Sequence, residues 1–494
     1  MTTTSTTSRP AARSLRLPFL ALVLAMLPAV LDQTILATAL PTIAGELGQL
    51  SDVSWLVTVY VVAATASTPL WGKLGDRLGR KRLLTISLAW FVAASAACGI
   101  AQTITELIVL RGAQGIAAGG LMTLAMAAVG DLVDPRERGR YQGYIAAAFA
   151  GATVVGPLVG GLLADHASWR WVFYVNVPVG IAALVALRAT FPATPPAGAR
   201  QRLDATGAAL LAAATSALLL ACVWGGERYA WDSATIVGLL GATAALAAGL
   251  VVRERRTADP IVPLGMLRSR TVRMASGALF LGTAALFSVV VFVPLFLQVA
   301  TGASPTEAGL LLVPMMLGTT LSTNLAGRRI SRTGRYAQYP PIGLGLMAVA
   351  LLVLAALAHE HSRTATGLGL ALFGVGFGLV TQVLVVAVQN AVDRRELGMA
   401  TALTGFFRAL GGSLGAAALG AVFAAQSGTS TGHIATRLDP QLVEDITAAA
   451  QTVWFAAAPL AALGALVAWR IGASAKAAAP RHAGPAVATQ GTAR

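Results

Sequence analysis

The sequence predicts an all-α membrane protein with fourteen spanning helices. The chain has 494 residues, of which 56% are hydrophobic and only 12% charged, and its mean hydropathy is +0.71. A soluble domain carries about 25% charged residues. Long apolar runs recur along the whole chain, and the lysines and arginines gather between alternate runs. A chain of this composition needs lipid as its solvent.

Each apolar run is long enough to cross a bilayer, which takes about 20 helical residues. An even number of spans places both termini on the same side of the membrane. In chain order the predicted spans are residues 17–40, 53–71, 83–102, 106–129, 141–164, 171–190, 205–224, 235–252, 272–298, 307–327, 340–358, 366–389, 399–424 and 450–471.

The basic residues give the orientation. Of 36 lysines and arginines, all but six lie in the two tails and in alternate loops. Four of those six lie in the intervening loops, and Arg111 and Arg408 lie within spans. Loops rich in lysine and arginine stay in the cytoplasm. We therefore expect both termini in the cytoplasm, in a cell's cytoplasmic membrane. The net charge of +15 belongs to these loops, so we expect no nucleic-acid partner.

The sequence offers no enzyme chemistry. Cys98 and Cys222 lie inside apolar runs, as small buried residues do. The chain has no phosphate-binding loop, no metal-ligand cluster and no nucleophile arrangement. We expect no catalytic residue, no metal and no cofactor, with energy supplied by a proton gradient.

A basic loop follows the second span. In Gly72-Lys-Leu-Gly-Asp-Arg-Leu-Gly-Arg-Lys-Arg82, three glycines permit a tight turn and Asp76 is the single acid. We expect Asp76, Arg80 and Asp131 to form a cytoplasmic latch, together with the loop residues Gly72, Arg77 and Gly79.

The loop has a weaker second copy at Gly327–Arg335. The two copies align without gaps, and Ser331 replaces Asp76. Parallel repeats around a central cavity are typical of one class of transporter. The domains that follow are a cytoplasmic tail (1–16), a six-helix bundle (17–190), two inserted helices with a linker (191–271), a second bundle (272–475) and a disordered tail (476–494).

Asp32 is the one carboxylate deep in a span. Arg111 lies at a similar depth, because the two residues are about 14 Å and 9 Å below the predicted outer surface. A buried aspartate beside an arginine can bind and release a proton as its surroundings change. We predict that the pair couples transport to protons, with a structural ion pair as the alternative.

Other polar and small residues within spans are candidates for function. Gly151, Gly156, Pro157, Gly160 and Gly161 allow close helix contact and a kink in one span, and tight packing alone is the alternative. Arg408 either faces a cavity or bonds to helix carbonyls. The remaining cavity candidates, each of which could instead bond between helices, are Gln33, Gln114, Asn176, Gln298, Asn324, Gln382 and Gln389.

Taken together, these segments resemble the major facilitator superfamily. The loop at 72–82 is similar to its loop-2/3 signature, residues 107–115 to its helix-4 motif and residues 151–161 to its antiporter motif. Residues 31–41 and 169–180 resemble signatures of the 14-helix drug:proton antiporters. The resemblance argues against a signal peptide at residues 9–39. It also implies that Asp76 faces a helix N-terminus of the other bundle.

The sequence therefore predicts a major facilitator fold and a proton-coupled antiporter. We expect it to export small amphipathic drugs or antibiotics by alternating access, as a monomer in the lipid bilayer. One deep acid favours monovalent cationic or neutral cargo. The alternatives are a dedicated exporter of one endogenous metabolite, such as an antibiotic, amino acid or lipid precursor, and a non-transporting membrane sensor.

Overall fold

The computed structural model describes residues 15–47, 50–135, 137–192, 204–226, 228–257, 260–261, 265–303, 305–393, 396–427 and 440–477. Within these ranges the chain is helical throughout, apart from turns and one isolated bridge between Gly225 and Tyr229. The helices are α1 (Arg16–Leu47), α2 (Leu50–Leu78), α3 (Arg80–Ile100), α4 (Ile104–Leu132), α5 (Arg138–His166), α6 (Trp171–Tyr174), α7 (Asn176–Thr190), α8 (Ala205–Trp224), α9 (Ala234–Arg256), α10 (Arg270–Ala300), α11 (Pro305–Leu310), α12 (Val313–Thr333), α13 (Tyr339–Ala356), α14 (Arg363–Asn390), α15 (Leu397–Ser427) and α16 (Pro440–Ala477).

Every predicted span falls on one helix or on two consecutive helices. Among the described residues, thirteen helical segments are long and apolar enough to cross a membrane. The fourteenth predicted span lies in α5, a helix of 29 residues whose side chains are described only in part. Two spans are interrupted, between α6 and α7 and between α11 and α12. Pro178 and Pro314 lie in the first turns of α7 and α12, where the missing N–H group breaks the helical hydrogen-bond pattern.

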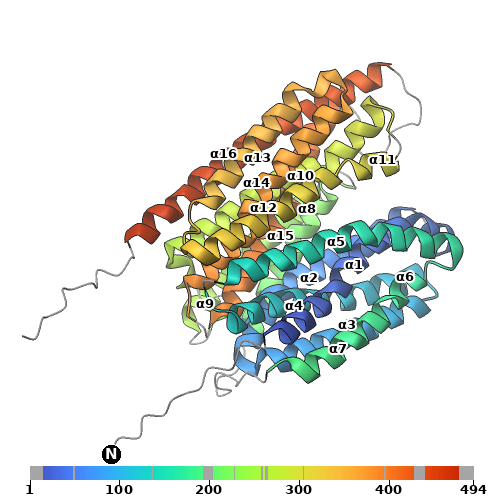
Figure 1. The fold of residues 1–494 in the computed structure, drawn as a ribbon. Coiled ribbons are helices and arrows are strands. Elements are labelled where there is room, and N and C mark those ends of the chain that lie inside the picture. The colour runs from blue at the N-terminus through green and yellow to red at the C-terminus, as the bar shows by residue number, and fades with distance from the viewer. Residues whose placement is uncertain are drawn as a thin grey trace, which may run out of the picture.

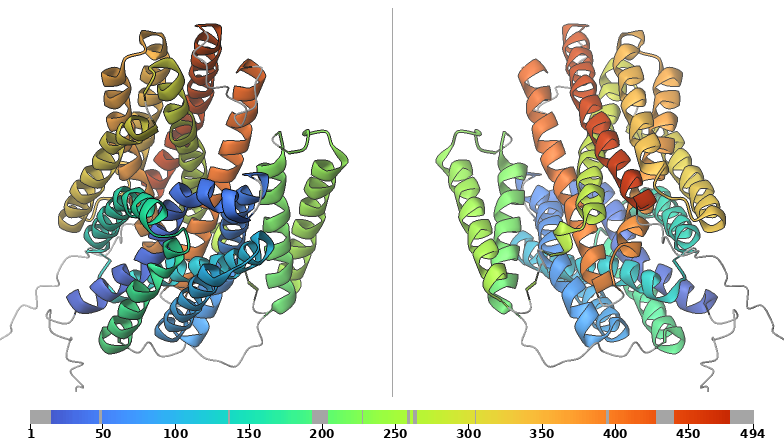
Figure 2. Two further views of the ribbon diagram at one scale, coloured as in Figure 1. Left: turned by 90° about the vertical axis from the view of Figure 1, so that its right-hand side faces the viewer. Right: turned by 90° about the vertical axis from the view of Figure 1, so that its left-hand side faces the viewer.

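The helices form two groups (Figure 1). In the first, α1, α2, α3, α4, α5 and α7 pack on one another, and in the second, α10, α12, α13, α14, α15 and α16 do so. The two groups meet where α5 packs against α12 and α2 against α15. Figure 2 shows α8 and α9 as a hairpin at one edge, where α8 contacts α2 and α15.

The two copies of the repeated loop share a glycine with positive φ at the end of a helix. Gly79, between α2 and α3, and Gly334, after α12, both have positive φ, at 89° and 69°. The aligned Gly72 and Gly327 both lie where the two groups touch, Gly72 on Gly398 of α15 and Gly327 on Gly139 of α5. We call the end of the molecule that carries these contacts the basic end.

The glycines of the basic loop act differently from our expectation. Only Gly79 forms the turn between the helices, because α2 continues to Leu78 and α3 begins at Arg80. Gly72 and Gly75 are helical, and both lie in close contacts: a Cβ atom at Gly75 would collide with the side chain of Leu124. From the sequence alone, a glycine that forms a turn cannot be distinguished from a glycine inside a helix that allows close packing.

The α8–α9 hairpin is tied at the basic end by one carboxylate. Asp204 caps α8 by accepting the N–H of Gly207 at 3.0 Å, and it also accepts from Arg253 and Thr257 of the α9 end. The Gly207 hydrogen bond and the Arg253 charge lower the pKa of Asp204 below its ordinary value, against the opposing effect of burial.

Asp204 should make stability depend on pH. A carboxyl group with a lowered folded-state pKa stabilises the fold above its unfolded pKa of about 3.9 and loses that effect as pH falls through the folded value. We expect Asp204→Asn to lower the melting temperature in detergent at pH 7. The deficit should shrink as the pH is lowered below about 4. An equal deficit at pH 7 and at pH 3 would contradict this.

Close glycine contacts also hold the second group together. At Gly374 in α14, a Cβ atom would collide with the backbone oxygen of Met315 in α12, whereas at Gly345 in α13 it would meet nothing within 4 Å. We expect Gly374→Ala to cost about 1–3 kcal/mol through overpacking and to lower the melting temperature by several degrees. Gly345→Ala is the matched control, and it should be neutral or stabilising by up to about 1 kcal/mol. Equal melting temperatures for the two variants would contradict the packing role of Gly374.

Candidate functional site

The first helix group holds a buried and fully hydrogen-bonded carboxylate. The Asp32 side chain on α1 has no exposed surface, and its Oδ2 lies 2.5 Å from Nη1 of Arg111 on α4. The side-chain amides of Gln114 and Asn176 donate to Oδ1 at 2.9 and 3.0 Å. A charge inside a membrane needs such partners, because an isolated buried ion is strongly unfavourable. One acid thus joins α1, α4 and α7.

Arg111 has partners besides Asp32. Its Nη1 donates to Oε1 of Gln114 at 2.7 Å, and its Nε donates to the Leu56 carbonyl at 3.4 Å. Its guanidinium carbon lies 4.2 Å from the ring centroid of Tyr60 on α2. A desolvated cation–π contact contributes about 2 kcal/mol or more. Arg111 therefore has contacts in this structure that do not involve Asp32.

Two glycines of α4 bring Tyr60 to this position. Cβ atoms at Gly115 and Gly119 would collide with the backbone oxygens of Tyr60 and Ala64 on α2. Spaced four residues apart, the two glycines lie on one face of α4 and let α2 approach closely. Tyr60 was not among the predicted site residues. Tyr60, Ala64 and Thr68 follow one another at intervals of four residues, so the sequence did indicate that they lie on one face of a helix.

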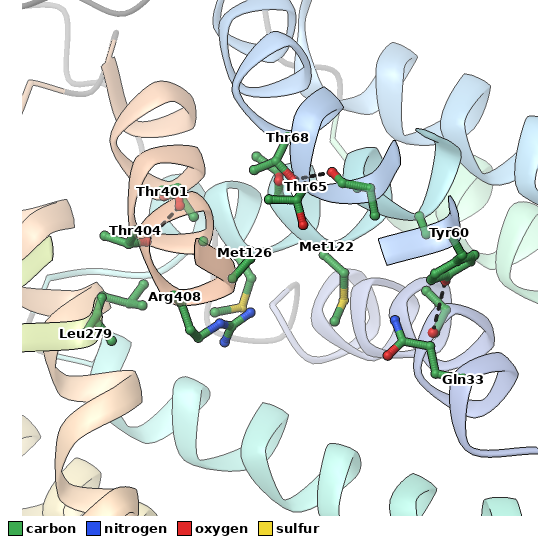
Figure 3. A pocket seen from close by; sticks show the side chains of 18 residues that line it. Gln33, Tyr60, Thr65, Thr68, Met122, Met126, Leu279, Thr401, Thr404 and Arg408 are labelled. Carbon is green, nitrogen blue, oxygen red and sulfur yellow. Dashed lines mark hydrogen bonds between the residues drawn. The ribbon is translucent and has the colours of Figure 1, made fainter. Parts of the chain in front are cut away.

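A cavity of about 120 Å³ lies between the two helix groups (Figure 3). That volume is equivalent to about four water molecules and is below the roughly 300–1,000 Å³ of drug-sized sites. Helices α1, α2 and α4 form one wall, and α10, α14 and α15 form the other. The lining residues are Ala29, Gln33, Tyr60, Ala64, Thr65, Thr68, Ala118, Gly119, Met122, Thr123, Met126, Leu279, Val385, Thr401, Thr404, Gly405, Arg408 and Ala409.

Tyr60 and Arg408 contribute the strongest polar groups of the wall. The Tyr60 hydroxyl donates to the Ala29 carbonyl at 3.3 Å, so the ring is fixed between the cavity and Arg111. Arg408 comes from the opposite wall, and Figure 3 shows its guanidinium directed toward Met122 and Met126. Of the two intramembrane arginines, one is therefore enclosed in a network and the other faces the cavity.

Two of the eight cavity candidates line this cavity, and four of the other six bond to other helices, which is the alternative that the sequence left open. Hydropathy identifies a polar residue in a span, but the rotation of each helix decides which way it faces. Only Gln33 and Arg408 line the cavity. Gln114 and Asn176 hold Asp32, Asn324 donates to Gly143 of α5, Gln389 donates to Met126 and Thr401, and Gln298 and Gln382 lie outside the lining set.

The acid of the basic loop connects the two helix groups. Asp76 accepts the backbone N–H groups of Gly398 and Met399, in the first turn of α15, at 2.8 and 2.9 Å. A helix N-terminus favours an anion. Arg80 lies 2.7 Å from both Asp76 and Asp131, so the three predicted latch residues do meet. Arg77 lies in the last turn of α2.

Arg138 is a second link at the basic end that the sequence analysis did not identify. It lies at the start of α5 and donates to the Gln389 carbonyl at 3.1 Å and to Asn390 Oδ1 at 2.7 Å, both on α14. It also donates to the Gly130 carbonyl at 2.5 Å. No sequence signal distinguished it from the other arginines of a basic loop.

The predicted antiporter motif lies on α5. Gly156 packs against Thr34 of α1, where a Cβ atom would collide with the threonine hydroxyl, and Gly151 has open space around it. Gly160 is buried. The side-chain surroundings of Pro157 and Gly161 fall outside the part of the chain that the structure describes.

Comparison with known proteins identifies the family. The family model for the Major Facilitator Superfamily matches residues 22–416. The chain belongs to this superfamily. Its described helices include thirteen segments long and apolar enough to cross a membrane, in agreement with the predicted multi-pass membrane fold. Among solved structures, this superfamily member shares its fold with the human organic anion transporter MFSD10 and the proton:xylose symporter XylE. Their TM-scores are 0.64 and 0.63 over 93% of this chain and 100% and 96% of those chains, at 18% and 15% identity.

Several superfamily relatives carry names that indicate drug export. The chain is 36% identical to the multidrug transporter protein MdtP of Bacillus subtilis over 82% of this chain and 75% of that protein. It is 33% identical to multidrug resistance protein 3 of the same organism, over 85% and 81%. An uncharacterized MFS-type transporter of Mycobacterium tuberculosis is 42% identical over 82% of this chain, which spans only 59% of that protein's length.

The contacts of Asp76 predict an effect on access to the cavity. Removing charged hydrogen bonds worth about 1.5 kcal/mol should shift the equilibrium toward opening at the basic end about tenfold. We expect Asp76→Asn to raise the rate at which a single cysteine at position 401 reacts with an impermeant maleimide, with Cys98 and Cys222 replaced by alanine. Inside-out vesicles should show the increase.

Asp134→Asn is the matched control, because Asp134 is exposed at the same end of the molecule. Its labelling rate should equal that of the parent protein. Equal rates for Asp76→Asn and Asp134→Asn, at matched expression, would remove the latch role from Asp76.

Proposed function

We propose that this transporter is a proton-coupled antiporter that exports small amphipathic drugs or antibiotics across the cytoplasmic membrane. Support comes from relatives whose names describe multidrug transport and efflux. The observation that carries the proposal is the buried Asp32–Arg111 pair, separated from a cavity between the two helix groups by the ring of Tyr60.

The pair has the arrangement that reversible protonation requires. Removing one charge from a buried ion pair ordinarily costs about 3–5 kcal/mol, because the other charge is left unpaired. Here Gln114, the Leu56 carbonyl and the Tyr60 ring would still hold Arg111 after Asp32 gained a proton. These contacts reduce the cost of leaving Arg111 without a charged partner, which supports a coupling role for the pair.

Tyr60 provides a physical connection between proton and cargo. Its ring lies on the Arg111 guanidinium, and the same residue lines the cavity. If Arg111 moves when Asp32 is protonated, the ring that rests on it must move as well. The shape of the cavity wall would then depend on the charge of Asp32. Cargo in contact with Tyr60 would in turn change the position of Arg111 relative to Asp32.

The contacts between the groups suggest how access alternates. At the basic end, Asp76 and Arg138 tie α2 to α15 and α5 to α14. This arrangement suits a state that is closed on the predicted cytoplasmic side. Release of these contacts would let the two groups rock apart and open the cavity to the cytoplasm, as alternating access requires.

A proton gradient would supply sufficient energy. One proton moving down a potential of about 150 mV releases roughly 3.5 kcal/mol. Since about 1.4 kcal/mol corresponds to a factor of ten, one proton could support accumulation of several hundredfold. A cofactor is not needed for this cycle.

Replacing Asp32 tests the proposal. We expect Asp32→Asn to reduce protonophore-sensitive efflux of amphipathic fluorescent probes, tested as an anionic, a neutral and a cationic set, by at least about tenfold, the factor that corresponds to about 1.4 kcal/mol. Efflux is measured from cells at matched protein levels. The double variant Asp32→Asn/Arg111→Gln removes both charges, so it should recover thermal stability but not coupled efflux.

Glu46→Gln is the matched control on the same helix, because Glu46 is half-exposed and pairs with Arg170 at 3.2 Å. It should transport normally. Coupled efflux by Asp32→Asn at the parent rate would refute the role of the pair. A parent protein that moves none of the amphipathic probes would instead favour a dedicated metabolite exporter.

A further inference from the structure

The charge of the cavity differs from what the deep aspartate suggested. Among its described lining residues, Arg408 is the only one with a charged side chain, and none is an acid. Asp32 lies outside the lining set and has no exposed surface. A cationic cargo would therefore meet a positive group and no carboxylate in this cavity.

Arg408 has unused hydrogen-bonding capacity. A guanidinium has five N–H donors. The structure gives Arg111 donor bonds to Asp32, Gln114 and Leu56, and it gives Arg138 bonds to α14. Within the described ranges, Arg408 makes no hydrogen bond or ion pair. A charged side chain at this depth is unfavourable unless water or an anion meets it.

The position of Arg408 directs these donors into the cavity. It lies eleven residues into α15, or about 16 Å from the start of that helix, and so is deep in the membrane. Thr401, Thr404 and Arg408 repeat at spacings of three and four and all line the cavity. Figure 3 shows the guanidinium extended toward the opposite wall.

The rest of the wall fits the body of an amphipathic molecule. Met122, Met126, Leu279 and Val385 provide flexible and branched apolar surface, and Tyr60 provides an aromatic ring. Methionine adapts to irregular shapes, which suits a site for varied cargo. The volume of about 120 Å³ in this state admits an acidic head group and a few attached carbons.

We propose that Arg408 is the cargo-recognition residue and that the exported molecules are amphipathic organic anions, which bind with a carboxylate or sulfonate on the guanidinium. This inference rests on the proposed export function and names its substrate class. A planar guanidinium pairs with such acids through two parallel hydrogen bonds. A negative-inside membrane potential drives an anion outward, so export of this cargo agrees with the direction of the field.

The direct test is binding to the purified full-length protein in phosphatidylcholine nanodiscs. The probes share one pyrene body and carry a butyl sulfonate, a neutral butyramide or a butyl trimethylammonium group. We expect the sulfonate to bind at least tenfold more tightly than the ammonium probe. Arg408→Gln should lose at least tenfold for the sulfonate and change less than twofold for the amide, whereas Arg408→Lys should keep part of the preference.

Arg363→Gln is the matched control, because Arg363 pairs with Glu307 at 3.5 Å and both side chains are half-exposed. Its affinities should equal those of the parent protein. Melting temperatures, recorded with and without each probe, show whether Arg408→Gln is folded, and stabilisation by the sulfonate gives a second measure of binding. If Arg408→Gln is unfolded, the comparison of Arg408→Lys with the parent protein decides. Equal affinity of the parent for all three probes, or tighter binding of the ammonium probe, would overturn the proposal.

Two further experiments distinguish a lipid head group from a free organic anion, and binding of an anion from its export. If phosphatidylglycerol displaces the sulfonate with an affinity that depends on Arg408, while the free sulfonate binds weakly, the anion is a lipid head group and the cargo proposal fails. Efflux from proteoliposomes under a pH gradient tests export itself. Movement of the ammonium probe but not the sulfonate keeps export and overturns the anion inference. Binding of the sulfonate through Arg408 without movement of any probe keeps the site and refutes export.

Discussion

The buried pair of Asp32 and Arg111 is the constraint on which the first helix group depends. An acid in an apolar medium must be neutralised, and here that takes an arginine and two amides from α4 and α7. The arginine in turn requires Tyr60 close by, which the glycines at positions 115 and 119 make possible. One charge therefore dictates which helices meet, how closely they pack and where the cavity wall begins.

The interface between the two groups combines small residues with charged hydrogen bonds. Gly72 and Gly327, which occupy equivalent places in the repeat, let α2 meet α15 and α5 meet α12. The repeat is unequal in charge, because Asp76 bonds to the first turn of α15, while the aligned position 331 is a serine. On the α5 side, Arg138 bonds to α14 instead. The two contacts thus use side chains of opposite charge.

The cavity and the ion pair share a wall but differ in electrostatics. The aspartate is withdrawn behind Tyr60, and the cavity presents a guanidinium, threonine hydroxyls and apolar side chains. If Asp32 carries the proton, as we propose, proton and cargo do not compete for one carboxylate. The contact between the ion pair and the cavity wall is then the packing of Tyr60 on Arg111.

The sequence by itself determined the fold class and the spans, and the family resemblance implied that Asp76 faces a helix terminus, as it does. The length of the apolar runs, the placement of basic residues and the repeated motif can all be read from the sequence. In a bilayer, such apolar runs must form helices, because their backbone polar groups have no water to bond. The sequence also marked Asp32 and Arg111, since charges within spans are conspicuous. Only the tertiary structure decided which polar residues face the cavity. Helix rotation and packing set those directions. Gln114 and Asn176 contact the aspartate, whereas Arg408 faces the cavity. The contacts of Tyr60 and Arg138 depend on helices distant in sequence, so no local pattern predicts them.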